Sequence, residues 1–179
     1  MLQSHNPPPG WTGLPIVLVG LMGAGKSTVG RRLAARLSLP FVDADHEIEA
    51  AAGMTVAEIF DRFGEAYFRD GERRVIARLI DGRPKVIATG GGAFINAETR
   101  ALILDQTTAI WLSAHPDVLV ERVRRRDTRP LLRGRDPHGV LSELASVRDP
   151  IYALAPIHVA SNRTPHDATV AAILKAIGR

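Results

Sequence analysis

Residues 20–27 read Gly-Leu-Met-Gly-Ala-Gly-Lys-Ser, which matches the phosphate-binding pattern G-x-x-x-x-G-K-[ST]. Glycines let the backbone approach a ligand closely, so the N–H groups of such a loop can converge on phosphate oxygens. Lys26 would reach the β- and γ-phosphates, and the Ser27 hydroxyl would bind Mg²⁺. The stretch therefore predicts a nucleoside triphosphate site whose other cradle residues are Gly23, Ala24, Gly25 and Thr28.

The segments on either side of this loop fit the mechanism. The β-branched run 16–19 predicts a buried strand. After Lys26, the apolar residues Val29, Leu33 and Leu37 recur at helical spacing. Strand, glycine loop and helix follow in the order that phosphate binding needs, which disfavours the alternative of a glycine-rich turn with a chance lysine.

Asp43 and Asp45 follow a short predicted strand at 41–42. In an extended segment, residues two apart point the same way, so both carboxylates could face the cleft beside the phosphate loop. Phosphoryl transfer needs Mg²⁺ and a group that orients the attacking hydroxyl, and two carboxylates could divide these tasks. The alternative is a solvated turn, or a cap for a helix that starts near His46.

Gly90, Gly91 and Gly92 follow the predicted strand 86–88 and would expose backbone polar groups above the sheet. A loop that merely needs unusual dihedral angles is the alternative. A common phosphate-loop pattern has an aspartate after such a strand, but Thr89 stands there in this chain. The acid that anchors the metal must therefore come from elsewhere, and Asp43 is the nearest candidate.

A dense arginine cluster lies at 122–135 and is interrupted by glycine and prolines. In a phosphate-handling enzyme this pattern predicts a lid over residues 122–137 that excludes water and stabilises charge on the transferred phosphate. The cluster contains no interleaved aromatic residues, which disfavours nucleic-acid binding. Arg69 and Arg148 each stand alone in a helical stretch, where arginine is more often a surface charge than a ligand clamp.

The whole-chain properties are those of an ordinary globular protein. The 179 residues are 45% hydrophobic and 23% charged, with no cysteine and a net charge of +4. We expect a flexible tail over residues 1–13 and one domain over 14–179. The sequence offers no membrane span and no signal-peptide pattern, so we expect a cytoplasmic protein, by default a monomer, that binds neither membrane nor nucleic acid.

Five short apolar runs alternate with helical stretches along the chain. They lie near 16–19, 41–43, 86–88, 108–112 and 157–159. This alternation predicts an α/β fold with three layers, α/β/α, around a parallel sheet of about five strands. Ligands of such folds bind at the carboxyl ends of the strands, where Gly20, Asp43 and Gly90 all lie.

Taken together, these motifs resemble the shikimate kinase family from about Leu14 to the C-terminus. The resemblance rests on residues 20–27, Asp43-x-Asp45, Gly64-Glu-x-x-Phe-Arg-x-x-Glu72, the triple glycine, Arg129-Pro-Leu-Leu132 and Arg148-x-x-x-Tyr152. It implies the nucleoside monophosphate kinase-like version of the P-loop fold. It also implies transfer of the ATP γ-phosphate to the 3-hydroxyl of shikimate, a step of aromatic amino acid biosynthesis through chorismate.

The resemblance also implies roles for particular residues. On the acceptor side, within a binding region over 44–80 and beyond, Asp45 would hold the ring hydroxyls and act as base. Arg69 and Arg148 would grip the carboxylate of shikimate, and Gly90, Gly91 and Gly92 would line its pocket.

On the nucleotide side, the resemblance implies that Asp43 holds Mg²⁺ through water together with Ser27. Arg129 would be the lid arginine beside the transferred phosphate and would share catalysis with Lys26 and Asp45. The adenine would be flanked by Arg125, Arg163 and Pro165.

Two other functions remain open at this point. Gluconate kinases and nucleoside monophosphate kinases share the phosphate loop and lid, although a nucleotide acceptor would need a larger region than 44–80. A nucleotide-binding switch without turnover is an alternative of another class. It would leave the acceptor-side residues unexplained, and the chain lacks the Asn-Lys-x-Asp motif of GTPase switches.

Overall fold

A computed structural model describes residues 11–125, 132 and 134–178. In this part of the chain, five parallel strands form one sheet in the order β2-β3-β1-β4-β5. The strands are β1 (Ile16–Val19), β2 (Phe41–Asp43), β3 (Val86–Ala88), β4 (Thr108–Ser113) and β5 (Ile157–Ala160). The register places Val17 of β1 opposite Ile87 on one side and Ala109 on the other. The predicted five-stranded parallel sheet is confirmed.

Helices connect the strands. They are α1 (Lys26–Leu37), α2 (Ala44–Ala52), α3 (Val56–Leu79), the short 3₁₀ helix η1 (Ala93–Ile95), α4 (Ala97–Gln106), α5 (Pro116–Arg124), α6 (Pro137–Tyr152) and α7 (His166–Ala176). Both α5 and α6 begin at a proline, which suits the first helical position because no hydrogen bond is needed there. Residues 122–124 of the predicted lid belong to α5.

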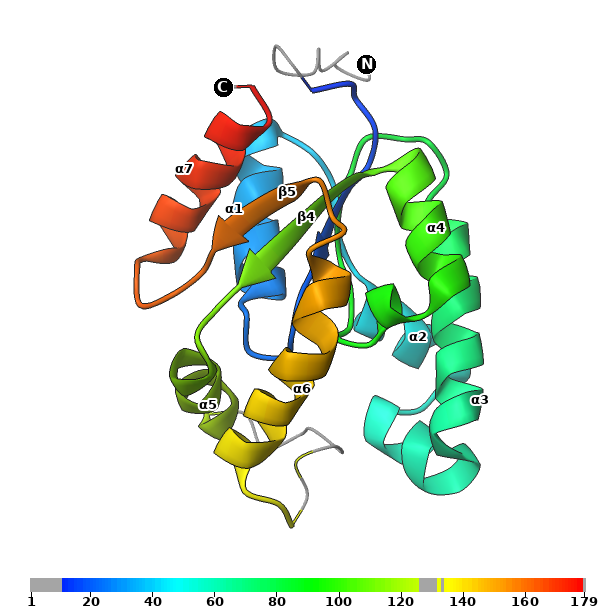
Figure 1. The fold of residues 1–179 in the computed structure, drawn as a ribbon. Helices are drawn as coiled ribbons and strands as arrows, with labels where there is room; N and C mark the ends of the chain where they lie inside the picture. The colour runs from blue at the N-terminus through cyan, green and yellow to red at the C-terminus, as the bar shows by residue number, and fades with distance from the viewer. Residues whose placement is uncertain (1–10, 126–131, 133, 179) are drawn as a thin grey trace.

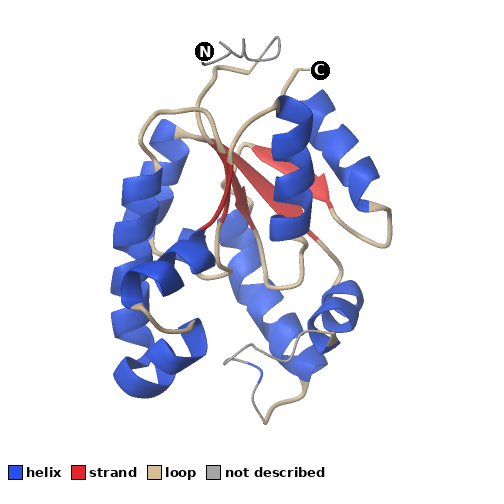
Figure 2. Cartoon of the chain, turned by 180° about the vertical axis from the view of Figure 1, so that it is seen from behind, coloured by secondary structure: helices blue, strands red, loops and turns tan. Residues whose placement is uncertain are grey.

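The helices cover both faces of the sheet. Figure 1 shows α1 and α7 side by side on one face and α3 and α4 on the opposite side, and the reverse view in Figure 2 agrees. All four residues of β1, the central strand, are buried, as expected for a parallel strand with helices above and below it. The three-layer α/β/α architecture follows from this arrangement.

The segment between β2 and β3 shows how local sequence sets the helix ends. Gly53 closes α2 in the left-handed conformation, with φ of 66°. Thr55 and Glu58 form a capping box at the start of α3. Gly64 has non-helical backbone angles, with φ of 83°, and divides α3 at a kink.

The N-terminal tail predicted over residues 1–13 needs a correction at its end. The side chain of Trp11 is 6% exposed and belongs to the hydrophobic core. Its indole N–H donates to the carbonyl oxygen of Leu14, at 3.0 Å. Burial of this large ring fixes the chain before residue 14, whereas residues 1–10 lie outside the described part.

Within the described residues, no helix combines the length and the hydropathy that crossing a membrane requires.

Candidate active site

The phosphate loop opens directly into the N-terminus of α1. Gly25, the N-cap, supplies no side-chain hydrogen bond, and the first turn holds no acidic residue. The first N–H groups of a helix have no partner within the helix, so this positive end favours an anion. The buried Lys26 reaches back over the loop, and its Nζ donates to the carbonyl oxygens of Gly20 and Leu21 at 2.7 and 2.8 Å.

Asp43 connects this loop to the neighbouring strand. Its Oδ2 accepts a hydrogen bond of 2.6 Å from the Ser27 hydroxyl. Its Oδ1 accepts from the backbone N–H groups of Asp45 and His46, at 3.0 and 3.4 Å. Asp43 therefore caps α2, which was the alternative interpretation of this residue, and also lies beside Ser27.

Asp45 reaches the cleft by a different route from the expected one. The prediction assumed an extended segment through both aspartates, but α2 begins at Ala44, so Asp45 lies in the first helical turn. The cap at Asp43 turns the chain into the helix there. Both carboxylates nevertheless line the same cleft as Gly23, Gly25, Lys26, Ser27 and Thr28.

The triple glycine brings the acceptor-side residues together. A Cβ on Gly90 would lie 2.9 Å from the carboxylate of Asp45 and 3.0 Å from that of Glu72. A Cβ on Gly92 would lie 2.3 Å from the guanidinium of Arg69, and one on Gly91 would lie 3.6 Å from that of Arg148. One glycine turn thus lies in contact with Asp45 and with both arginines that were predicted to bind the acceptor.

Glu72 holds Arg69 in place. The Arg69 guanidinium donates to Glu72 Oε1 at 3.0 Å, and the Glu72 side chain is only 3% exposed. The second oxygen, Oε2, is buried without a hydrogen-bond partner in the described part of the chain. Burial raises the pKa of the Glu72 carboxyl above its ordinary value, although Arg69 opposes the shift. The sequence placed Glu72 in a motif but gave no sign of its burial.

Tyr152 fixes the middle glycine from the opposite side. This side chain is fully buried, and its hydroxyl donates to the carbonyl oxygen of Gly91. Burial raises the pKa of Tyr152 to about 12, so the phenol keeps the proton that it donates. Tyr152 lies one helical turn after Arg148 on α6, and the Arg148 charge acts on the phenol. The α6 helix therefore positions both Gly91 and Arg148.

Arg122 is a nucleotide-side residue that the sequence analysis did not single out from its cluster. Its guanidinium donates to the carbonyl oxygens of Gly23 and Ala24, both at 3.1 Å, and to that of Asn162 at 2.6 Å. It therefore ties α5 to the phosphate loop and to the loop after β5. The helical spacing of Leu119, Val123 and the half-buried Arg122 could have indicated that this arginine faces inward.

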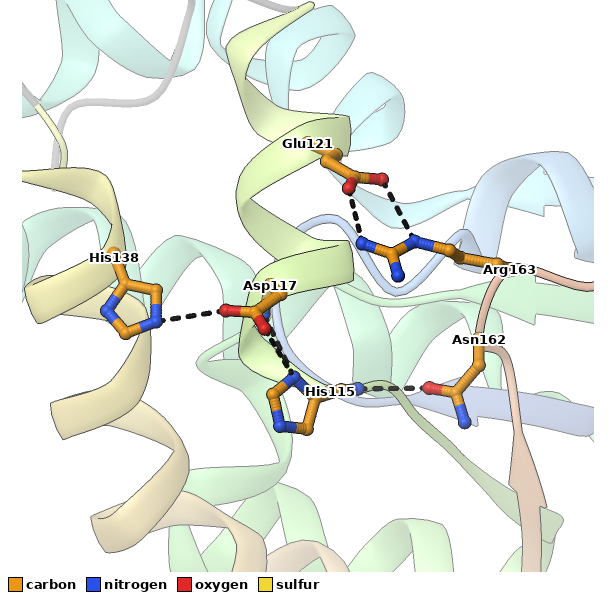
Figure 3. A network of polar contacts seen from close by, with 6 residues as sticks. All are labelled: His115, Asp117, Glu121, His138, Asn162 and Arg163. Atoms are coloured by element: carbon orange, nitrogen blue, oxygen red, sulfur yellow. Dashed lines mark hydrogen bonds and ion pairs between the residues drawn. The ribbon is translucent and has the colours of Figure 1, made fainter.

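A second groove adjoins the phosphate cleft, and Arg125 and His166 line both. Arg163 and Pro165, which were predicted to flank adenine, also line this groove. Arg163 donates to Glu121 of α5 at 2.6 Å, and Asn162 accepts from the backbone N–H of His115, as Figure 3 shows. These contacts join the loop after β5 to α5 along the groove.

The remaining predicted residue, Arg129, lies outside the described part of the chain, as does most of the predicted lid. Thr89 donates its hydroxyl to the carbonyl oxygen of Leu18 at 2.8 Å and is thereby held against β1.

Comparison with known proteins identifies the family. The family model described as shikimate kinase matches residues 22–178. The chain belongs to the shikimate kinase family. Shikimate kinase from Caulobacter vibrioides is 62% identical over 162 residues, which span 90% of this chain and 81% of that protein. Shikimate kinase from Zymomonas mobilis is 55% identical over 179 residues, with both chains fully covered.

A solved structure supports the same family at the level of the fold. Shikimate kinase from Acinetobacter baumannii, in complex with shikimate, is 38% identical, with a TM-score of 0.89 and 93% of each chain covered. The nucleoside monophosphate kinase-like fold and the family resemblance are thus confirmed. As a member of this family, the chain is an ATP-dependent kinase, and the alternatives of a gluconate kinase, a nucleotide kinase or a switch fall away.

The variant Glu72→Gln tests whether the buried carboxyl that holds Arg69 has a raised pKa. The pKa of Glu72 is raised in the folded state, so its contribution to stability is fully present below about pH 4.5 and is lost as the pH rises through the folded-state value. Glutamine does not titrate. We therefore expect the difference in melting temperature, Glu72→Gln minus wild type, to be larger at pH 8 than at pH 5 by thermal unfolding. A melting-temperature difference that does not change with pH would contradict the raised pKa of Glu72.

Proposed function

We propose that this protein transfers the γ-phosphate of ATP to the 3-hydroxyl of shikimate and forms 3-phosphoshikimate and ADP. One observation carries the proposal. A single glycine turn at the edge of the sheet lies against Asp45, Arg69 and Arg148, and Asp45 shares a cleft with Lys26. A small hydroxylated acid needs such a combination: an acceptor for its hydroxyl proton and arginine forks for its carboxylate.

The nucleotide side would work by electrostatics. The N–H groups at the start of α1 bind phosphate oxygens, and Lys26 places its charge on the β- and γ-phosphates. Two of its hydrogen bonds go to neutral carbonyl oxygens of the same loop, which hold the ammonium group beside the phosphate site.

The residues beside the loop fit Mg²⁺. Asp43 and Ser27 offer a carboxylate and a hydroxyl whose oxygens are 2.6 Å apart. Mg²⁺ usually binds one or two protein groups together with water and phosphates, so such a pair is enough to hold it. When bound, Mg²⁺ would neutralise charge on the phosphates.

The acceptor side would fix one pose of the substrate. Arg69 and Arg148 bind the carboxylate at one end, while Asp45 accepts a hydrogen bond from a hydroxyl at the other. Two different anchoring ends permit only one orientation, which selects the hydroxyl that meets the γ-phosphate. Glu72 and Tyr152 support this arrangement by holding Arg69 and Gly91. We propose that Arg129 acts from the lid on the transferred phosphate.

Replacing Arg69 with alanine tests the carboxylate clamp. A hydrogen bond to a charged group is worth roughly 1.5–3 kcal/mol, so we expect the KM for shikimate to rise about tenfold to a hundredfold, with the KM for ATP nearly unchanged. Steady-state kinetics with each substrate varied measures both. Arg74→Ala is the matched control, because Arg74 lies on the same helix, is exposed and pairs with Asp70. An unchanged KM for shikimate in Arg69→Ala would contradict the clamp.

The substrate is tested with the purified enzyme. Shikimate, gluconate and AMP are supplied at equal concentrations with ATP and Mg²⁺, and ADP release is followed. We expect turnover with shikimate alone. If shikimate gives no ADP above background, the proposed function is wrong. Turnover of gluconate instead would show that gluconate is the acid that the enzyme phosphorylates.

We further propose a monomer in the cytoplasm that uses only small-molecule partners. Lys26 and Asp45 line one cleft, and Asp45, Arg69 and Arg148 meet one glycine turn of the same chain, which supports a monomer. ATP is supplied in the cytoplasm, and the mild net charge of +4 gives no support to nucleic-acid binding. Sedimentation of the purified protein at micromolar concentration tests the monomer.

A further inference from the structure

His166 is a polar residue at the nucleotide cleft to which neither the motif nor the resemblance gives a role. It begins α7 and lines both the phosphate cleft and the adjoining groove. Its ring lies against the phosphate loop, because a Cβ on Gly25 would be 3.5 Å from His166 Cε1. The residue therefore stands where the triphosphate site meets the groove assigned to the base.

The two ring nitrogens of His166 have different surroundings. Nδ1 is buried and has no hydrogen-bond partner among the described residues. The other nitrogen, Nε2, belongs to the same ring, which lines the phosphate cleft and the adjoining groove. A buried N–H without an acceptor is costly, so the proton of the neutral ring belongs on Nε2. The side chain thus offers an N–H donor at Nε2 of a ring that lines the cleft.

The charges around His166 favour an anion over a hydroxyl. Arg122 and Arg32 both act on the ring electrostatically and, together with burial, lower the pKa of His166. The ring is therefore neutral near pH 7. Arg32 is paired with Asp167 at 2.9 Å, so Arg122 is the cation that remains beside the ring. A neutral N–H donor beside the Arg122 guanidinium and the amino end of α1 suits a phosphate oxygen.

We propose that His166 is a nucleotide-binding residue whose Nε2–H donates to the α-phosphate of bound ATP or ADP. The α-phosphate is the anionic group between the β-phosphate, which the loop holds, and the nucleoside in the adjoining groove. This inference rests on the proposed function for the identity of the nucleotide. It adds a contact from α7, an element outside the phosphate-loop motif.

The test measures binding without turnover. The dissociation constant of MgADP is determined by titration calorimetry for wild type, His166→Phe, His166→Gln and His166→Asn. Phenylalanine keeps the ring and removes the donor, so we expect the Kd to rise about tenfold or more. Glutamine places an amide N–H near the position of Nε2 and should keep the Kd within about threefold of wild type. Asparagine places its amide near Nδ1 and should behave like phenylalanine.

Controls separate binding from folding and from the reaction. His138→Phe removes an exposed histidine of α6 that pairs with Asp117 (Figure 3), and it should leave the Kd of MgADP unchanged. Shikimate affinity and melting temperature should stay near wild type in His166→Gln and His166→Phe. The loss caused by phenylalanine should persist with 2′,3′-dideoxy-ADP, because that ligand keeps its α-phosphate.

Four results would overturn the proposal. A Kd for His166→Phe within twofold of wild type would mean that an enclosed water, or nothing, satisfies the ring. A parallel fall in shikimate affinity and melting temperature would mean a structural role. Loss of the effect with 2′,3′-dideoxy-ADP would assign the contact to the ribose. Failure of the wild-type protein to bind MgADP would overturn both this proposal and the proposed function. Binding of MgADP without turnover of shikimate would overturn the proposed function alone.

Discussion

Lys26→Ala is expected to lower kcat by about two to three orders of magnitude, which is the usual effect of removing one preorganised electrostatic group at the transferred charge. The Lys26 side chain is buried at the start of α1 with its Nζ at the loop carbonyls. Water would not replace its charge at the γ-phosphate. Single-turnover phosphorylation of shikimate at saturating ATP measures the effect on the chemical step.

The same lysine also bonds two carbonyl oxygens of its own loop, so the experiment must separate charge from loop structure. Lys26→Arg keeps the charge, and its rate should exceed that of the alanine variant. The exposed Lys175 of α7 provides a control, because Lys175→Ala should match wild type. A kcat for Lys26→Ala within tenfold of wild type would show that the loop lysine is not needed at the transferred phosphate.

Asp45→Asn should reduce kcat by about 10²–10⁴-fold, the range of a group that takes or orients a proton in the transition state. Asparagine has the same shape but lacks the negative charge. Because Asp45 lies at the acceptor end of the cleft, against Gly90, the Kd of MgADP should stay within about twofold of wild type. Titration calorimetry and steady-state kinetics provide the two measurements.

Asp105→Asn is the matched control for this variant, since Asp105 is an exposed residue of α4. A comparable loss of ADP affinity and of kcat in Asp45→Asn would move this carboxylate from the acceptor to the nucleotide or its metal. Retention of full activity would leave the hydroxyl without a partner in the proposed mechanism.

The sequence predicted the fold well because its signals are local. The β-branched run in β1 and the box formed by Thr55 and Glu58 act within a few residues of themselves. Trp11 was misplaced in the tail because its burial in the hydrophobic core is a property of the tertiary structure.

The site was only partly predictable for a similar reason. Motif spacing brought Asp45, Arg69 and Arg148 to notice, but their contact with one glycine turn is a property of three separate helices. The sequence did not distinguish Arg122 from the neighbouring arginines, because only the tertiary structure shows which guanidinium groups point inward. The buried Oε2 of Glu72, which has no hydrogen-bond partner among the described residues, lies against Gly90, and that approach also depends on tertiary structure.

Asp43 makes two different contacts, and both limit the substitutions that this enzyme can accept at position 43. One of its oxygens meets Ser27 and the other begins the helix that carries Asp45. With the roles proposed above, a substitution at Asp43 that changes metal affinity would also displace Asp45 from the acceptor hydroxyl. The proposed donor and acceptor halves of the site are thus coupled through one carboxylate, so a change of partner in one half would disturb the other.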